Sequence, residues 1–226
     1  MKNFENHRVR VAARKREAME GKLLMSGLLL ASEKSIHDIT IEEIVLRSEV
    51  SRGTFYKYFP SVPSLFKMLA LKIGLELAEV FTALKPEIAD PAVSVSICTR
   101  MALRLVVSYP LLARLMLQIQ WPSLESDSTI FKMVEGDIEK GIRQQRFNNM
   151  PIKLGSSLLI GGMLGAVDEM LKQLPATGYE DKVVFHVLLS FGLDLTTAQQ
   201  LSTLPITHQP AIPMDGIFAK ILALHP

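Results

Sequence analysis

The stretch Ser51-Arg52-Gly53-Thr54-Phe55-Tyr56-Lys57-Tyr58-Phe59 decides the fold of this chain. It combines hydroxyls, a glycine, two cations and four aromatic rings in less than three helical turns, a mixture that neither a core helix nor a solvated helix needs. Just before it, residues 40–48 predict another short helix with one apolar face. Because only Glu49 and Val50 separate the two, the sequence predicts a helix-turn-helix, whose second helix enters the major groove of DNA.

Capping signals set the boundaries of these helices. Thr40 is a good N-cap, and Glu43, three residues later, completes a capping box. Ser51 caps the next helix, because its side chain can accept a hydrogen bond from a backbone N–H two or three residues later. The recognition helix is therefore predicted over residues 52–59, and a long helix follows over residues 62–84.

Composition indicates a globular protein that can bury a sizeable core, with 226 residues of which 48% are hydrophobic. The longest apolar run, residues 154–167, is interrupted by serines and glycines and is shorter than the ~20 residues of a membrane span. No apolar stretch precedes Gly21, so we expect no secretory signal, and the single Cys98 excludes an internal disulfide. We expect a cytoplasmic protein without a membrane partner.

The positive charge is concentrated at the N-terminus. Residues 1–60 hold eleven Lys and Arg against eight Asp and Glu, and the first sixteen residues hold six against one. A basic arm ahead of a helix-turn-helix attracts a phosphate backbone, since each neutralised phosphate releases condensed counterions. The alternative interpretation is a frayed, solvated terminus.

Apolar periodicity predicts helices along the rest of the chain, and no stretch alternates with the period of a strand, so the fold class is all-α. The expected domains are a basic arm (1–14), a helix-turn-helix domain (15–75), a larger helical regulatory and dimerisation domain (76–202) and a proline-containing tail (203–226). The predicted helices cover residues 15–32, 92–110, 111–121, 131–146, 152–174, 180–201 and, in the tail, 214–224, with a loop at residues 122–128.

The order of these features and the segment TIEEIVLRSEVSRGTFYKYFPS (residues 40–61) resemble the TetR family of bacterial transcriptional regulators. The motif match covers about residues 15–75, and the remainder is matched by helix layout. The resemblance implies an N-terminal head that binds double-stranded operator DNA, usually as a repressor, with a TetR-type activator as the alternative. It also implies a homodimer whose C-terminal domain usually holds a pocket for a small-molecule effector, here an apolar one, and it implies no cofactor.

Three positions depart from the family pattern. Glu49 stands in the turn where glycine is usual, because the chain there takes a left-handed conformation that costs a residue with a side chain ~1 kcal/mol or more. Ser35 replaces the glycine that usually ends the first helix, and Val62 replaces a lysine that would lie near the DNA backbone. We therefore expect the arm before Lys15 to carry more of the phosphate binding than usual.

Residues of the recognition helix take different roles in this hypothesis. Arg52 and Thr54 read base edges, since arginine binds guanine through two hydrogen bonds and threonine offers a hydroxyl and a methyl, while Gly53 lets the backbone approach closely. Phe55 and Phe59 are expected in the core. The residues expected to contact phosphates are Ser51, Tyr56, Lys57 and Tyr58, with Thr40 at the start of the preceding helix.

The C-terminal half carries the predicted dimer interface and effector pocket. Four glycines within residues 152–174 suggest a face that another helix approaches closely, in the dimer or, alternatively, within the monomer. The expected interface residues are Leu158, Gly162, Gly165, Val184, Leu188 and Phe191. An apolar pocket is expected at Met101, Leu105, Met116, Trp121, Phe131 and Met133, for which an ordinary core role is the alternative. The polar residues Arg100, Arg104 and Asp168 either orient a ligand or are in ion pairs or solvated.

An enzyme is not predicted. The five histidines are scattered, no pair has the spacing of metal ligands, and Cys98 has no neighbouring histidine. We therefore expect no catalytic residue and no metal. A second alternative is an all-α lipid-binding or protein-interaction module with a vestigial helix-turn-helix, which Glu49 and Val62 favour.

Overall fold

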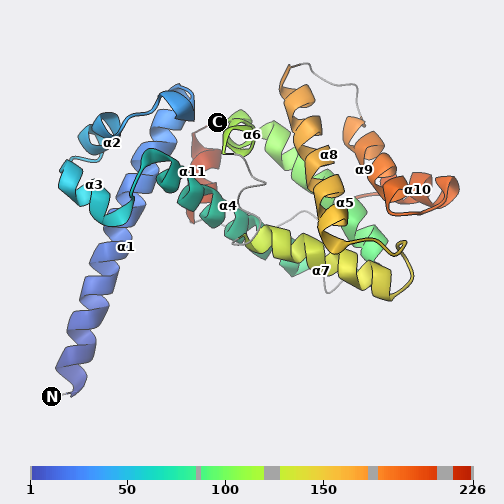
Figure 1. Ribbon diagram of the computed structural model, residues 1–226, viewed down its shortest axis with the longest axis horizontal. Coiled ribbons are helices and arrows are strands. Elements are labelled where there is room, and N and C mark those ends of the chain that lie inside the picture. Colours follow the sequence, from blue (N-terminus) through green and yellow to red (C-terminus); the bar gives the residue numbers. More distant parts are fainter. Residues whose placement is uncertain (1, 85–87, 120–127, 173–177, 208–215, 225–226) are drawn as a thin grey trace. The chain divides into compact units, whose positions relative to one another are not determined.

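The computed structural model of the protein describes residues 2–84, 88–119, 128–172, 178–207 and 216–224. Every regular element in these ranges is a helix, so the predicted all-α class is confirmed. The chain divides into two compact units, Met1–Ala70 and Leu71–Pro226. Figure 1 shows the helices of each unit.

The first unit is built on the helix α1 (Lys2–Glu33), which a single 3-10 turn, η1 (Ile36–Asp38), connects to two short helices, α2 (Ile41–Arg47) and α3 (Arg52–Tyr58). α2 packs against α1, beside its C-terminal half in Figure 1, and α3 packs against α2. The start of α4 (Val62–Leu84) completes this unit. The most deeply buried side chains of its core, at most 1% exposed, include Leu23, Leu24, Leu28, Ile44, Phe55 and Leu65.

α1 begins earlier than expected. The sequence places its start at residue 15, where the apolar periodicity begins, but the structure continues the helix back to Lys2. Residues 2–14 contain no proline or glycine, and residues 10–16 are mainly alanine, arginine and lysine, which are strong helix formers. The basic arm is thus a helical extension of α1, and Arg10 and Arg14 are exposed on it.

In the second unit, α5 (Pro91–Ser108) is the central helix. It contacts α6 (Pro110–Gln118), α7 (Thr129–Arg143), α8 (Ile152–Lys172), α9 (Tyr179–Ser190) and α10 (Leu195–Ser202). Proline occupies the first position of both α5 and α6, where its missing N–H is tolerated. A shared core between α5, α7, α8, α9 and α10 includes Val95, Ile138, Leu159, Val184, Leu188 and Phe191.

The prediction of one helix over residues 180–201 is wrong, because the structure has two helices there. Gly192 takes φ +92°, a conformation open to glycine, and Asp194 caps α10 by accepting a hydrogen bond from the Thr197 N–H at 3.0 Å. Apolar spacing continues across this break and hides it. Phe191 is fully buried before the break, whereas Leu195 after it is 68% exposed.

The last helix, α11 (Gly216–Ala223), is anchored by Glu76 of α4. The Glu76 carboxylate accepts hydrogen bonds from the N–H groups of Ile217 at 2.9 Å and Phe218 at 2.7 Å. Phe218 and Ile221 are fully buried. The predicted short helix at residues 214–224 is therefore confirmed over Gly216–Ala223, while residues 208–215 of the predicted tail lie outside the described residues.

α5 and α8 are long and apolar enough to cross a membrane by length and composition alone, but they differ in burial. The apolar segment of α5 is 67% buried within the chain, whereas that of α8 is only 28% buried. Leu154 and Leu158 of α8 are 51% and 40% exposed. α8 thus presents an apolar face that the single chain leaves uncovered.

Candidate nucleic-acid interface

A capping box holds the start of α2, as predicted. The Glu43 N–H donates to the Thr40 hydroxyl at 3.3 Å, and the Thr40 N–H donates to the Glu43 carboxylate at 2.9 Å. Lys34 also donates to Glu43, at 2.5 Å. The hydrogen bond from Lys34, followed by those from Thr40, lowers the pKa of Glu43 from 4.5 to about 2. The start of α2 therefore depends on an ionised carboxylate.

The turn between α2 and α3 has the left-handed conformation that the family resemblance implies. Glu49 takes φ +50°, which costs a residue with a side chain about 1–2 kcal/mol. Its exposed carboxylate lies 3.5 Å from the Lys22 ammonium of α1. An exposed ion pair at this distance offsets only part of the strain, since such pairs contribute about 0–1 kcal/mol.

Ser51 caps α3 in the predicted way. Its hydroxyl accepts a hydrogen bond from the Thr54 N–H at 3.0 Å and lies 2.9 Å from the Thr54 hydroxyl. The helix then runs over Arg52–Tyr58, and Phe59 is its C-cap. The N-terminus of the recognition helix is thus capped by hydroxyl groups that are themselves exposed or half-buried.

The side chains of α3 divide between a core face and an open face. Phe55 and Phe59 are 0% and 4% exposed and their rings are 6.0 Å apart, which confirms their predicted core role. Tyr56 is 50% exposed. The other predicted DNA contacts are exposed (Thr40, Ser51, Arg52, Gly53 and Lys57) or half-buried (Thr54 and Tyr58).

The fold itself leaves room for a side chain at Gly53. A Cβ built there would lie 3.7 Å from its nearest neighbour, the Ser51 hydroxyl, which is an ordinary contact distance. Glycine is also a poor helix former, less favourable than alanine by about 1 kcal/mol. No packing contact among the described residues therefore requires glycine at this position.

Arg52 is paired with a residue that the sequence did not point to. Its Nη1 atom lies 2.8 Å from Oε1 of Glu42 on α2, and the two side chains are 61% and 59% exposed. The ten-residue separation spans the turn, so no helical i, i+4 spacing reveals the pair. Lys57, by contrast, forms no ion pair with any residue that the structure describes.

Val62 is half-buried at the first position of α4, next to a reciprocal cap. Ser64 donates its N–H to the Ser61 hydroxyl at 3.3 Å, and Ser61 donates its N–H to the Ser64 hydroxyl at 3.1 Å. The predicted helix over residues 62–84 is confirmed. The start of α4 is thus well formed, with an apolar side chain where the family pattern has a cation.

A small apolar cavity of about 50 Å³ lies in the second unit. One face of α5 and one face of α7, each with i, i+3, i+4, i+7 spacing, provide most of its lining. Phe81 of α4 and Leu159 and Met163 of α8 complete it. Drug-sized ligands occupy pockets of roughly 300–1,000 Å³, so the cavity is smaller than such a ligand. The lining residues of α5 and α7 are Val95, Cys98, Thr99, Ala102, Ile130, Met133, Val134 and Asp137.

Of the five predicted pocket residues that the structure describes, only Met133 lines this cavity. Met101, Met116 and Phe131 are buried at 6%, 8% and 3% exposure, and Leu105 is half-buried. Trp121 lies outside the described residues. The i, i+3, i+4, i+7 spacing of Val95, Cys98, Thr99 and Ala102 could have indicated the lining of the cavity from the sequence. The same spacing is equally typical of a helix face in the core.

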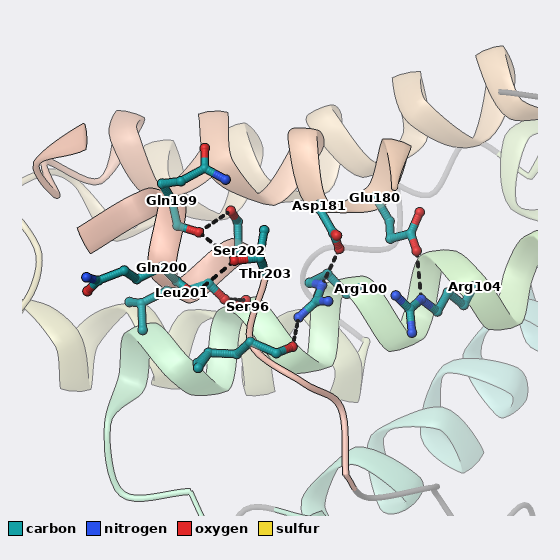
Figure 2. Close-up of polar contacts among 11 residues, drawn as sticks. Ser96, Arg100, Arg104, Glu180, Asp181, Gln199, Gln200, Leu201, Ser202 and Thr203 are labelled. Atoms are coloured by element: carbon teal, nitrogen blue, oxygen red, sulfur yellow. Dashed lines mark hydrogen bonds and ion pairs between the residues drawn. The ribbon is translucent and has the colours of Figure 1, made fainter. Parts of the chain in front are cut away.

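The polar candidates of this unit form ion pairs, and Figure 2 shows those of Arg100 and Arg104. Arg100 is 3% exposed; its Nε lies 2.6 Å from the Asp181 carboxylate, and its Nη1 donates to the Leu204 carbonyl at 2.5 Å. Arg104 pairs with Glu180 at 2.7 Å, and Asp168 pairs with Lys172 at 2.5 Å. The Asp168 hydrogen bond raises the pKa of Lys172. The ion-pair alternative thus accounts for Arg100, Arg104 and Asp168.

The predicted interface residues fall into two groups. On α8, Leu158, Gly162 and Gly165 are exposed, and a Cβ built on Gly165 would meet nothing within 4 Å. On α9 and at its end, Val184, Leu188 and Phe191 are each 0% exposed inside the single chain. The structure corrects their assignment, because side chains already surrounded by their own chain have no surface left for a second copy.

Comparison with known proteins gives a family match within the first unit and a fold match over most of the chain. Residues 23–68 match the family described as bacterial regulatory proteins of the tetR family. None of the curated protein sequences matches the chain. The similar solved structures include RolR in complex with resorcinol, which is 21% identical with a TM-score of 0.73 over 89% of this chain and 100% of that one.

Two further solved structures have the same fold. A regulator described as belonging to the tetR family, from Shewanella sp. PV-4, is 16% identical with a TM-score of 0.64, over 78% of this chain and 99% of that one. FadR from Bacillus subtilis, in complex with stearoyl-CoA, is 14% identical with a TM-score of 0.55, over 83% of this chain and 98% of that one. The tetR-family match thus covers the helix-turn-helix, and the solved structures share the fold of the larger part of the chain.

Proposed function

We propose that the protein is a dimeric, sequence-specific DNA-binding repressor that a small, largely apolar ligand releases from its operator. The observation that carries this proposal is the open face of α3. Around the unfilled space at Gly53 it gathers Ser51, Arg52, Tyr56 and Lys57, while the phenylalanines of the same helix are buried. A protein that only needed a folded head would not require this combination.

Each group on this face suits a different part of DNA. Arg52 offers a guanidinium to guanine, and Thr54 offers a hydroxyl and a methyl to a neighbouring base. Lys57 neutralises phosphate charge without competition from an ion pair among the described residues. Hydroxyls that can donate to phosphate oxygens come from Ser51, Tyr56 and Tyr58, whereas the Thr40 hydroxyl already donates to the Glu43 carboxylate at 2.9 Å. The exposed cations of α1, among them Arg10 and Arg14, add to the positive field.

The exposed face of α8 supports dimerisation. Leu154 and Leu158 lie on it with Gly162 and Gly165, and the absence of Cβ atoms lets another helix approach closely. A symmetric dimer pairs this face with itself. Since operators that a dimer reads have two half-sites about one DNA turn apart, such a dimer also places two copies of α3 for binding.

The cavity between α4, α5, α7 and α8 is the candidate effector site. Its lining is mainly apolar, with Cys98, Thr99 and Asp137 as polar groups, so an apolar ligand with few polar atoms fits its chemistry. Its volume of about 50 Å³ means that such a ligand has to open the cavity on binding. RolR and FadR were solved with ligands that differ widely in size, resorcinol and stearoyl-CoA, which agrees with a fold that adapts its pocket.

Selection of bound duplexes from a random DNA pool tests the proposal. We expect the full-length protein to enrich a palindrome whose half-sites are separated by about one helical turn, with binding that weakens as salt increases. In a transcription assay the enriched site placed over a promoter should reduce expression. Failure to enrich any sequence at low salt would contradict the proposal, and enrichment with increased expression would indicate an activator.

A further inference from the structure

The pair between Glu42 and Arg52 suggests a second residue that controls which DNA sequence is read. Glu42 lies in the first turn of α2, and Arg52 is the first residue of α3. The 2.8 Å contact between Oε1 and Nη1 therefore joins the two helices of the helix-turn-helix directly. Both side chains are more than half exposed, so the contact lies at the surface that would face DNA.

We propose that Glu42 is a positioning residue for base reading, holding Arg52 ready for guanine and opposing its use as a general phosphate contact. This inference rests on the proposed DNA-binding function. An exposed arginine has many rotamers, and fixing it on binding costs up to about 2 kcal/mol of conformational entropy. A carboxylate that already holds one part of the guanidinium reduces the number of rotamers to be lost when DNA binds.

The donor count of arginine allows both partners at once. A guanidinium has five N–H groups arranged around a plane, and the described contact engages Nη1. The remaining donors can reach the O6 and N7 acceptors of a guanine, the usual two-bond contact in the major groove. Glu42 and guanine are therefore compatible neighbours of Arg52.

The charge of Glu42 has a separate effect. Phosphate contacts are independent of sequence and are available on every duplex. A carboxylate next to Arg52 lowers the net positive charge at this point and repels phosphates, so it weakens binding to any sequence that offers Arg52 no guanine. Glu42 thus increases discrimination between bases and decreases affinity for non-specific DNA. A variant without this carboxylate should discriminate less between bases and bind non-specific DNA more tightly.

The full-length Glu42→Gln variant tests this inference against the duplex that the wild type enriches, its single base-pair substitutions and a random duplex of the same length. At the base pair where Arg52→Ala loses preference, we expect E42Q to lose about 2- to 5-fold of the discrimination, the range of an exposed ion pair. Binding to the random duplex should become tighter, with a steeper salt dependence. In the E42Q background, Arg52→Ala should then cost less discrimination than in the wild type.

Glu33→Gln is the matched control. Glu33 also pairs with an arginine of α2, Arg47, at 2.8 Å, but its contact does not involve α3. E33Q removes the same charge from the same unit, so it should tighten random-duplex binding without changing base preference. Melting temperatures of both variants establish that the unit stays folded.

Unchanged preference at the Arg52 base pair in E42Q would overturn the inference, and so would an equal loss at every base pair or a loss at a base pair that R52A does not affect. The last result would mean that Glu42 reads a base by itself. These outcomes differ from failure of the proposed function, in which the wild type would enrich no sequence.

Discussion

The recognition helix α3 and the exposed helix α8 both carry glycines whose missing side chains leave open space, yet their surroundings differ. Gly53 lies among hydroxyls and cations, Ser51, Arg52 and Lys57. Gly165 lies on a face with Leu154 and Leu158. In both helices the fold has room for a Cβ, so neither glycine is explained by the packing of its own chain.

The difference between the two faces indicates what each one meets. A glycine among cations suits the close approach of a polyanion, whereas a glycine among leucines suits the close approach of another apolar helix. The two faces should therefore respond differently to the same kind of change. Charge on α8 should disrupt assembly, and a methyl group on α3 should disrupt DNA binding while leaving assembly intact.

The largest expected effect comes from Leu158→Asp. Leu158 is 40% exposed in the single chain, so folding should tolerate a carboxylate there, but burying the charge in a dimer costs several kcal/mol. We expect sedimentation to show monomers. Operator affinity should fall by about 100-fold or more, because the second half-site no longer benefits from effective concentration.

Leu195→Asp is the control for this variant. Leu195 is 68% exposed at the start of α10, outside the proposed interface. It should leave both the dimer and operator binding unchanged. A dimer that persists in L158D with wild-type affinity would show that the exposed face of α8 is not the interface.

Gly53→Ala should have the next largest effect. The new Cβ has ordinary contact distances within the chain, and alanine favours the helix by up to about 1 kcal/mol. We expect a higher melting temperature together with operator affinity reduced by about tenfold, since a methyl group between two closely packed surfaces costs roughly 1–3 kcal/mol. Calorimetry and gel-shift titration measure the two quantities.

Gly21→Ala provides the comparison, because Gly21 of α1 also has nothing within 4 Å of a built Cβ. It should raise stability without affecting DNA binding. If Gly53→Ala binds the operator as tightly as the wild type, close backbone approach is not the reason for this glycine.

Glu49→Gly should have a smaller effect with the same sign on stability and affinity. Glycine relieves the left-handed strain of about 1–2 kcal/mol, and the change removes a weak ion pair with Lys22 at 3.5 Å. The net stabilisation should be about 0.5–1 kcal/mol. Operator affinity should rise a few-fold, because a negative charge is removed beside α3.

Gln145→Gly separates the two contributions, since Gln145 takes φ +55° after α7 in the second unit. It should stabilise the protein without changing DNA affinity. Glu49→Gln, which removes the charge but keeps a side chain in the strained turn, should raise DNA affinity without stabilising the protein. Equal affinity of E49G and the wild type would mean that the turn lies too far from DNA for its charge to matter.

Local signals made the first unit predictable residue by residue. The caps at Thr40 and Ser51 each depend on residues close in sequence, so their chemistry can be read without knowing the fold. The left-handed conformation of Glu49 was expected from the family resemblance alone. The pair between Glu42 and Arg52 depends on how two helices cross. It was missed because no local spacing marks it.

In the second unit, periodicity identified helices but not their partners. Phe191 and Leu195 continue one apolar pattern, yet the first is fully buried and the second is 68% exposed. The break between them was signalled by Gly192 and the capping pattern of Asp194 with Thr197. Apolar spacing also could not tell Leu188, in the core of its own chain, from Leu158 on the open face of α8.

The smallest expected effect concerns pH, and it also distinguishes the two faces. Glu43 has a pKa of about 2 against an ordinary 4.5 because of its hydrogen bonds with Lys34 and Thr40. A carboxyl whose folded-state pKa is lowered stabilises the fold fully above its unfolded value, and this contribution is lost as pH falls from about 4.5 towards 2. The start of α2 should therefore loosen in that window.

Hydrogen exchange of the full chain, corrected for intrinsic rates, measures this loosening. We expect α2 to lose protection between about pH 5 and pH 2 in the wild type, while Glu43→Gln, without the carboxylate, should be less protected at neutral pH and change little across the window. Glu17→Gln, at an exposed position of α1, should behave as the wild type. The apolar face of α8 has no such dependence, because burial of its leucines involves no titration. If the hydrogen-exchange protection of α8 decreased over the same pH range as that of α2, the capping box and the apolar face would not differ in their pH dependence.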